Sequence, residues 1–407
     1  MRTVAEPASA VVALPPIRAT HLGIVAGLAM GPAVGLGLGR FAYALLLPAM
    51  RADLGWSYAV AGAMNTANAV GYLVGAFAAA PVASRVGDKR GFLAGVLLTA
   101  ISLLATGLVT DVMALALLRV VAGAAGALSL VTGGALASAA GGGGGRGRPA
   151  LVLGVYFGGA GFGMVVSAMA VPALVASIGW RSGWFVLGAL GLLGAAAALP
   201  ALARAPVVAE HGSRRAPAFS ARATRGMRAV LASYVLFGAG YIAYTTFIVA
   251  YLRTRLGFDA GAVTLFWGCA GAAASAAGFL WAPLLARLRG GRGVAVANAV
   301  VMLGAVLPVL LPTREAAYAS AVLFGGSFLI VPTSVTAFAR KAVTPAAWTA
   351  GIAMLTTGFA VGQCVGPWLT GEVSDRSYGV AGGLLLSGGI LAGAAVIALL
   401  QREPRAA

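Results

Sequence analysis

Long apolar stretches alternate with short polar breaks along the whole chain of 407 residues. Twelve of them are long enough to cross the roughly 30 Å hydrocarbon core of a bilayer, which takes about 20 residues of helix. They lie at residues 21–48, 58–83, 91–110, 113–139, 150–177, 183–203, 228–252, 261–286, 293–312, 315–339, 346–371 and 379–400. The pattern therefore predicts an all-α membrane protein with twelve transmembrane helices.

The longest polar break, at residues 204–227, separates two sets of six apolar stretches and is rich in Arg, Pro, Ala and Ser. We therefore expect an N-terminal six-helix bundle at 1–203, a cytoplasmic linker at 204–227 and a C-terminal six-helix bundle at 228–407. Because six is an even number, both bundles should insert in the same orientation. They should then be related by an axis along the membrane normal.

The second half of the sequence repeats the first at an offset of about 202 residues. Residues 39–43 align with residues 240–244, and Gly123 aligns with Gly325. A duplicated bundle of hydrophobic helices is typical of secondary transporters, in which the binding site lies at the interface between the repeats. The repeat therefore predicts a class of mechanism and leaves the transported molecule open.

Composition supports a membrane protein and excludes several other classes. Hydrophobic residues make up 60% of the chain and charged residues 9%, whereas a soluble protein carries roughly 25% charged residues. The net charge of +18 comes from residues in short loops, not from a patch with interleaved aromatic residues, so we expect no nucleic-acid partner. Cys269 and Cys364 lie inside apolar stretches, and His21 and His211 lie near or beyond the membrane edge. We therefore expect no disulfide framework, no metal site and no cofactor.

The distribution of Arg and Lys predicts the orientation of the bundle. With the N-terminus inside, the inner segments hold 20 basic residues and the outer loops hold six. Cytoplasmic loops carry an excess of Lys and Arg, so both termini should be cytoplasmic. The bias toward Arg, Ala and Gly is typical of a GC-rich bacterial genome, and we expect the bacterial inner membrane as the location.

The loop at residues 81–91, PVASRVGDKRG, joins the second and third predicted helices. It resembles the signature loop of the major facilitator superfamily, and residues 284–293 form a degenerate copy in the second half. In that family the loop is a conformational latch between helices, which implies this role for Arg85, Gly87, Asp88 and Arg90. Ser84 stands where the family has an acid, and Asp88 stands where a basic residue is usual, so a full charge relay is not expected.

Two further segments resemble the same superfamily. Residues 119–126, RVVAGAAG, are similar to its Arg-xxx-Gly element in the fourth helix. Residues 37–43, GLGRFAY, followed by LLPAM at 46–50, resemble the YbfB/YjiJ-like branch. The resemblance covers essentially the whole chain. It implies a multi-pass permease with the major facilitator fold, and it implies no particular substrate.

Glycines recur every four residues in the first predicted helix, at positions 23, 27, 31, 35 and 39. This spacing predicts a small-residue ridge on one helix face, which would let the backbone of a neighbouring helix come close. The ridge could serve static packing, or it could be a smooth sliding surface between helices that rock.

Two arginines lie inside predicted helices. Arg40 precedes Pro48 by roughly 12 Å of helix rise, and Tyr43 lies one turn further on, on the same face. An arginine at such depth costs at least a few kcal/mol unless it faces protein or water. Arg40 and Arg119 have no acid available within the predicted helices, so each is either bonded to carbonyl oxygens as a structural residue or pairs with an anionic group of a substrate.

Other polar side chains interrupt the apolar stretches in three places. Each could simply form an interhelical hydrogen bond worth about 0.6 kcal/mol. As a group they fit an apolar cavity with a few placed polar groups. The predicted substrate-binding set is Arg40, Tyr43, Asn65, Asn68, Tyr72, Arg119, Tyr241, Tyr244, Thr245 and Gln363.

The sequence thus predicts a secondary active or facilitative transporter that rocks two bundles about a central site. The partners that we expect are a small-molecule substrate and the lipid bilayer, and the protein should be a monomer. A small organic anion or a carboxylate-bearing metabolite is the best-motivated substrate, and proton-coupled efflux of amphipathic drugs or metabolites is the alternative. Glu372 is the nearest candidate for proton coupling. A non-transporting membrane sensor is the alternative of another class, and no enzyme is expected because the interiors of the predicted helices offer neither His nor acid.

Overall fold

The computed structural model describes residues 19–141, 149–206, 226–285, 287–343, 348–376 and 378–403. These residues form helices and connecting turns, without a β-strand. Twelve spans are long and apolar enough to cross a membrane, which confirms the predicted number. The predicted linker at 204–227 falls mainly outside the described residues.

The first half contains six membrane-length spans, the first of which is divided into four pieces. These pieces are α1 (Ala19–Leu28), α2 (Met30–Pro32), the π-helix η1 (Ala33–Phe41) and α3 (Tyr43–Leu54). The other spans are α4 (Tyr58–Val86), α5 (Asp88–Thr106), α6 (Val112–Ala140), α7 (Pro149–Ile178) and α8 (Trp180–Arg204).

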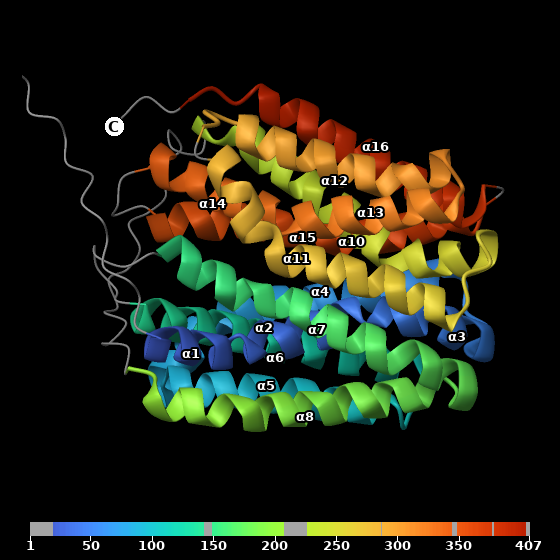
Figure 1. Ribbon diagram of the computed structural model, residues 1–407, viewed down its shortest axis with the longest axis horizontal. Coiled ribbons are helices and arrows are strands. Elements are labelled where there is room, and N and C mark those ends of the chain that lie inside the picture. Colours follow the sequence, from blue (N-terminus) through green and yellow to red (C-terminus); the bar gives the residue numbers. More distant parts are fainter. Residues whose placement is uncertain are drawn as a thin grey trace, which may run out of the picture.

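The second half also contains six spans, one of which is divided in two. They are α10 (Arg228–Arg255), α11 (Ala260–Leu285), α12 (Arg292–Leu310), α13 (Arg314–Phe328) with α14 (Ile330–Ala342), α15 (Trp348–Ser374) and α16 (Gly379–Leu399). The six spans of each half gather into one bundle, the first in the lower and the second in the upper part of the view (Figure 1). The two bundles meet mainly along two helix pairs, α4 with α15 and α7 with α11.

The helices begin and end at two opposite ends of the molecule. We call the end where α1 begins and α16 ends the terminal end, and the opposite end, where α3 ends and α4 begins, the far end (Figure 1). Within each half, successive spans alternate in direction between these ends, because the connections between them are short relative to the length of a span.

The sequence repeat corresponds to a repeated packing contact. A Cβ atom on Gly123 of α6 would lie 2.0 Å from the carbonyl oxygen of Asn68 on α4. A Cβ atom on Gly325 of α13 would lie 2.3 Å from the carbonyl oxygen of Ala270 on α11. Both members of the second pair are 202 residues after those of the first. Glycine is needed at both places because the helix backbones touch.

The first span is not the regular helix that the sequence predicts. Over Ala33–Phe41 it is a π-helix, and its end is marked by a hydrogen bond from the Ala42 amide to the Gly37 carbonyl, five residues back, at 3.0 Å. The predicted single-face glycine ridge is also wrong, because Gly27, Gly31 and Gly35 face α8, α5 and α6 in turn. A four-residue step exceeds one α-helical turn of 3.6 residues by about 40°, so the ridge winds around the helix.

The predicted latch loop forms a tight turn at the terminal end. α4 ends at Val86, Gly87 adopts a left-handed conformation with φ of +85°, and α5 begins at Asp88. Asp88 is buried in the first turn of α5, where the partial positive charge of the helix N-terminus stabilises a carboxylate. Arg85 and Arg90 are exposed. The conformational role of these residues stays a prediction.

Candidate functional site

Arg40 lies at the seam between the two bundles, about midway along the first span. Its side chain is only 2% exposed. Arg40 Nη2 donates a hydrogen bond of 3.0 Å to Gln363 Oε1 on α15, in the other half. The guanidinium also lies 5.2 Å from the centre of the Tyr72 ring on α4. A cation over an aromatic face is stabilised by the ring, which offsets part of the cost of burial.

Gln363 extends this contact into the second half. Its Nε2 donates a hydrogen bond to the hydroxyl of Tyr241 on α10. Tyr241 is the repeat counterpart of Arg40 in the sequence alignment. The equivalent positions of the two repeats are therefore linked through one amide side chain. The first half contributes the charge, and the second half contributes a neutral phenol.

Arg119 on α6 is held by the first half alone. Its Nη1 donates to the Gly39 carbonyl at 2.7 Å and its Nη2 to Asn65 Oδ1 at 3.4 Å. The guanidinium also lies 5.0 Å from the ring centre of Tyr43 and 5.6 Å from that of Trp184. These contacts tie Arg119 to the first span, α4 and α8, and they favour a positioning role for this side chain.

The two asparagines of α4 serve the same cluster in different ways. Asn68 Nδ2 donates to the Arg119 carbonyl at 3.1 Å. Asn65 Nδ2 donates to Thr246 Oγ1 on α10 at 2.6 Å, across the seam. Asn65 therefore connects Arg119 with the second half, and Asn68 fixes the backbone of α6.

The cluster carries two positive charges and no neighbouring carboxylate. Every described carboxylate lies in a loop or in the first or last turn of a helix, and the ion pairs of the described residues are both in such places. Arg40 and Arg119 are close enough to interact electrostatically. The Nε–H group of each is buried without a hydrogen-bond partner. An anion brought to this seam would therefore gain from both charges.

Three predicted residues lie apart from this cluster. The Tyr244 hydroxyl bonds with Ser320, and its ring packs on Phe324 with centres 4.1 Å apart. Thr245 donates to the Ile242 carbonyl of its own helix at 3.1 Å. Glu372 is half-buried in the last turn of α15, near the far end.

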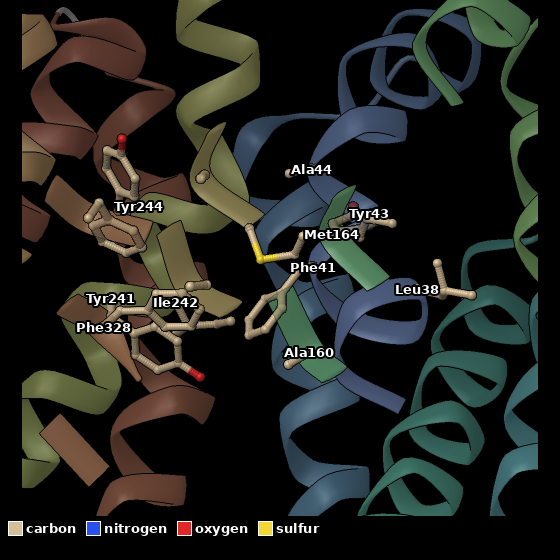
Figure 2. Packing of buried hydrophobic residues seen from close by; sticks show 14 of the residues in the cluster. Leu38, Phe41, Tyr43, Ala44, Ala160, Met164, Tyr241, Ile242, Tyr244 and Phe328 are labelled. Carbon is tan, nitrogen blue, oxygen red and sulfur yellow. The ribbon is translucent and has the colours of Figure 1, made fainter. Parts of the chain in front are cut away.

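An array of aromatic rings beside Arg40 was not predicted. Tyr234, Phe237 and Tyr241 on α10 and Phe359 on α15 present nearly parallel faces. Phe41, one residue after Arg40, points across the seam toward Phe328 and Tyr241 (Figure 2), and its ring meets that of Phe328 edge-on at 5.5 Å. The spacing of three and four residues along α10 could have been noticed in the sequence, whereas the approach of Phe359 could not.

The seam is closed at the far end. Asp375, directly after α15, accepts hydrogen bonds from the Tyr58 and Ala59 amides at the start of α4, at 2.7 and 2.8 Å. Further along the same pair of helices, Thr66 Oγ1 donates to the Cys364 carbonyl at 2.8 Å. These contacts hold α4 against α15 from the far end to the level of Arg40.

The other helix pair, α7 with α11, meets through small residues. A Cβ atom on Gly161 would lie 2.4 Å from the Gly271 carbonyl oxygen, and Ser275 Oγ donates to the Gly158 carbonyl at 3.1 Å. Backbone contact over several turns lets two helices pack closely without interlocking side chains.

A cavity of about 220 Å³ lies elsewhere, between η1, α7 and α8. Its lining is apolar and includes Val34, Leu38, Phe162 and Leu193. Phe162 and Leu193 are at least half exposed on the outside of the bundle, so this cavity faces the bilayer. It offers no polar group and is separate from the Arg40 cluster.

Two pseudo-symmetric six-helix bundles with buried polar contacts at their seam are the arrangement in which many transporters place a binding site between repeats. The chain belongs to the major facilitator superfamily, in the family described as "Uncharacterised MFS-type transporter YbfB", whose model matches residues 32–399. It is a multi-pass membrane protein, and its family and fold are those of transporters.

Related proteins agree with this assignment. The chain is 27% identical to a chloramphenicol resistance protein of Streptomyces lividans over 373 residues, which are 89% of this chain and 92% of the relative. A mutant of the nucleoside transporter NupG has a similar fold, with a TM-score of 0.75, 15% identity and coverage of 93% of this chain and 99% of that one. A bacterial homologue of the human lysosomal transporter Spinster, in an inward-facing and occupied conformation, matches with a TM-score of 0.70, 17% identity and coverage of 95% and 97%.

Proposed function

We propose that this transporter moves a small organic anion or a carboxylate-bearing metabolite through the seam at Arg40. The supporting observation is a buried guanidinium whose hydrogen-bond acceptor across the seam is a neutral amide, Gln363. A carboxylate can replace that amide oxygen and accept two parallel N–H bonds from the planar fork of Arg40. A neutral ligand would leave the positive charge uncompensated.

Alternating access requires the substrate to bridge two bodies that move relative to each other. Arg40 belongs to the first bundle, while Gln363 and Tyr241 belong to the second. A substrate bound between them would hold the seam in one arrangement. Arg119 adds positive potential from within the first bundle, where its hydrogen bonds keep it in place. In this scheme residues 1–203 and 228–407 are the moving bodies.

In this proposal the terminal end lies in the cytoplasm and the far end outside, in the bacterial inner membrane, and the Arg and Lys bias supports this orientation. The contacts of Asp375 and Thr66 close the seam on the outside. The described conformation is then one in which the site is shut off from the exterior.

Efflux of an amphipathic drug or metabolite is the second candidate function. It is supported by the 27% identity to a chloramphenicol resistance protein over most of both chains. For such a substrate the aromatic rings beside Arg40 would supply most of the binding free energy, and the charge would matter less.

Binding to purified protein separates the two functions. Arg40→Ala should weaken binding of a small carboxylate by roughly 30- to 4000-fold, from about 2–5 kcal/mol for a buried charge-assisted pair. Arg40→Lys should restore little of the carboxylate binding, since an ammonium group lacks the planar fork of a guanidinium. Arg51→Ala is the matched control, because Arg51 also lies over a tyrosine ring, 3.8 Å from the centre of Tyr58, but at the far end. Carboxylate affinity that is unchanged in a folded Arg40→Ala protein would reject the anion proposal.

A further inference from the structure

We propose, resting on the anion-transport function above, that the organic part of the substrate is a planar aromatic ring, so that the transported class is aromatic carboxylates. The first observation is a group of four rings stacked on one another, the aromatic wall, which reaches the Arg40 site through Tyr241 and Gln363. The Phe359 ring lies 4.6 Å from that of Tyr234, 5.7 Å from that of Phe237 and 5.7 Å from that of Tyr241, centre to centre. The corresponding interplanar angles are only 12°, 14° and 15°.

The aromatic wall runs along α10 from near the terminal end to the level of the cation. Tyr234 lies in the second turn of α10, counted from the terminal end, and Tyr241 lies two turns deeper. Tyr241 shares Gln363 with Arg40 through two hydrogen bonds. A ligand that enters from the terminal end would meet this stack of rings before its anionic group reaches the guanidinium.

Tyr72 of α4 completes the site from the first half. Its ring lies under Arg40 and its side chain is half-buried. It is within electrostatic range of both Tyr234 and Tyr241. Among the described residues, the hydroxyls of Tyr72 and Tyr234 have no hydrogen-bond partner, and both oxygens remain accessible. Two phenol groups are thus available to the edge of a bound ring.

A small cavity lies beside Tyr234, at the end of the aromatic wall that is nearer the terminal end. It is large enough for about one water molecule and is lined by Tyr234, Thr336, Thr356 and apolar side chains of α14 and α15. Unlike the cavity that faces the bilayer, it combines an aromatic face with hydroxyl groups. This chemistry suits a ring with a polar substituent better than an aliphatic chain.

Repeat symmetry does not account for the aromatic wall. The positions of the first half that correspond to Tyr234 and Phe237 are Ala33 and Leu36. The same helix position in the fold therefore packs well without an aromatic ring. The charge comes from the first half and the four stacked rings come from the second, so a ligand across the seam can meet a cation at one end and rings at the other.

Three probes test this inference on the purified full-length protein. Benzoate carries the ring and the charge, cyclohexanecarboxylate carries the charge on a saturated ring, and benzamide carries the aromatic ring without charge. Stacking on aromatic faces adds enough beyond area burial to predict about tenfold tighter binding of benzoate than of cyclohexanecarboxylate. Benzamide should bind weakly, because it leaves Arg40 uncompensated.

Phe359→Leu keeps an apolar side chain and removes a ring of the wall. It should lower benzoate affinity about tenfold and leave cyclohexanecarboxylate affinity unchanged. Tyr72→Leu provides a second variant if Phe359→Leu unfolds. Phe279→Leu is the matched control, because Phe279 is 50% exposed on α11, and it should preserve the preference.

The outcomes distinguish this inference from the anion proposal. If benzoate and cyclohexanecarboxylate bind with equal affinity, and Arg40→Ala abolishes the binding of both, the aromatic class is overturned and anion transport is supported. A benzoate preference that survives both Phe359→Leu and Tyr72→Leu would also overturn it. Binding of neither carboxylate would overturn both proposals, and tight benzamide binding that is insensitive to Arg40→Ala would favour efflux of neutral compounds.

Discussion

Replacing Asp375 should open the far end of the seam. Its two carboxylate oxygens cap the first two amides of α4, while Ser57, the residue before α4, caps the Val60 amide with its own side chain. Asp375 is thus the part of this cap that comes from the other half of the molecule. The Asp375→Ala protein keeps the local Ser57 cap and loses the contact across the seam.

The size of the effect follows from the exposure of the contact. Hydrogen bonds to a charged group contribute about 1.5–3 kcal/mol when buried, but Asp375 is exposed and the freed amides can bond to water. Loss of a side-chain cap at a helix N-terminus costs about 0.5–2 kcal/mol. We therefore expect Asp375→Ala to destabilise the closed arrangement by about 1–2 kcal/mol. This corresponds to roughly a 5- to 30-fold shift of the closed–open equilibrium toward the open arrangement.

A native cysteine can report this shift. Cys364 lies on α15 beside the seam, within electrostatic range of Arg40, and the only other cysteine in the sequence is Cys269. In a Cys269→Ala background, an impermeant maleimide should label Cys364 slowly in intact cells. Asp375→Ala should raise that rate roughly 5- to 30-fold and should lower the rate in inverted membrane vesicles.

Asp259→Ala is the matched control. Asp259 also lies at the far end and caps a helix, since its Oδ1 accepts from the Ala262 amide at 2.7 Å, but both residues belong to the second half. Its loss should leave the labelling rate unchanged. A rate for Asp375→Ala within twofold of the parent protein, or an equal rise with Asp259→Ala, would refute the idea that Asp375 closes the seam.

Three further predictions concern topology, coupling and packing. Single cysteines placed within 141–149 or 204–227, in a Cys-free background, should resist an impermeant thiol reagent in intact cells, and ready labelling would contradict the cytoplasmic assignment of these loops. If transport is proton-coupled, Glu372→Gln should abolish accumulation but leave exchange, and proton-driven uptake that survives in this variant would place the coupling site elsewhere. Gly161→Val should lower the thermal midpoint of the purified protein by several degrees, because its Cβ would lie 2.4 Å from a carbonyl oxygen of α11, whereas the same change at Gly23, where no atom lies within 4 Å, should have little effect.

The number and approximate limits of the spans could be predicted because each is an uninterrupted apolar stretch of membrane length. The repeat could be predicted for a similar reason, since glycines at helix contacts such as Gly123 and Gly325 leave a trace in the sequence. The π-helix could not, because its residues are as apolar as those of an α-helix. Its winding depends on packing against α6 and α7.

The composition of the polar cluster was partly visible in the sequence. Arg40, Arg119 and Gln363 are exceptions within apolar stretches, and such exceptions are costly unless they have partners. Their pairing was not visible, since Arg40 and Gln363 are separated by 323 positions in the chain. Tyr244 was predicted to bind substrate, but its hydroxyl group bonds with Ser320 of its own bundle.

The amino-acid sequence was enough to predict the membrane environment, the twelve spans, the duplication and two arginines deep in the spans without an acid at that depth. These are properties of local composition, and burying an apolar segment in lipid depends little on the other segments. Three contacts emerge only from the tertiary structure: Arg40 with Gln363 across the seam, Arg119 with groups of its own bundle, and Asp375 with the start of α4. Each of these depends on the relative position of helices from different parts of the chain, and that position is set by packing and hydrogen bonding between helices rather than by any one helix.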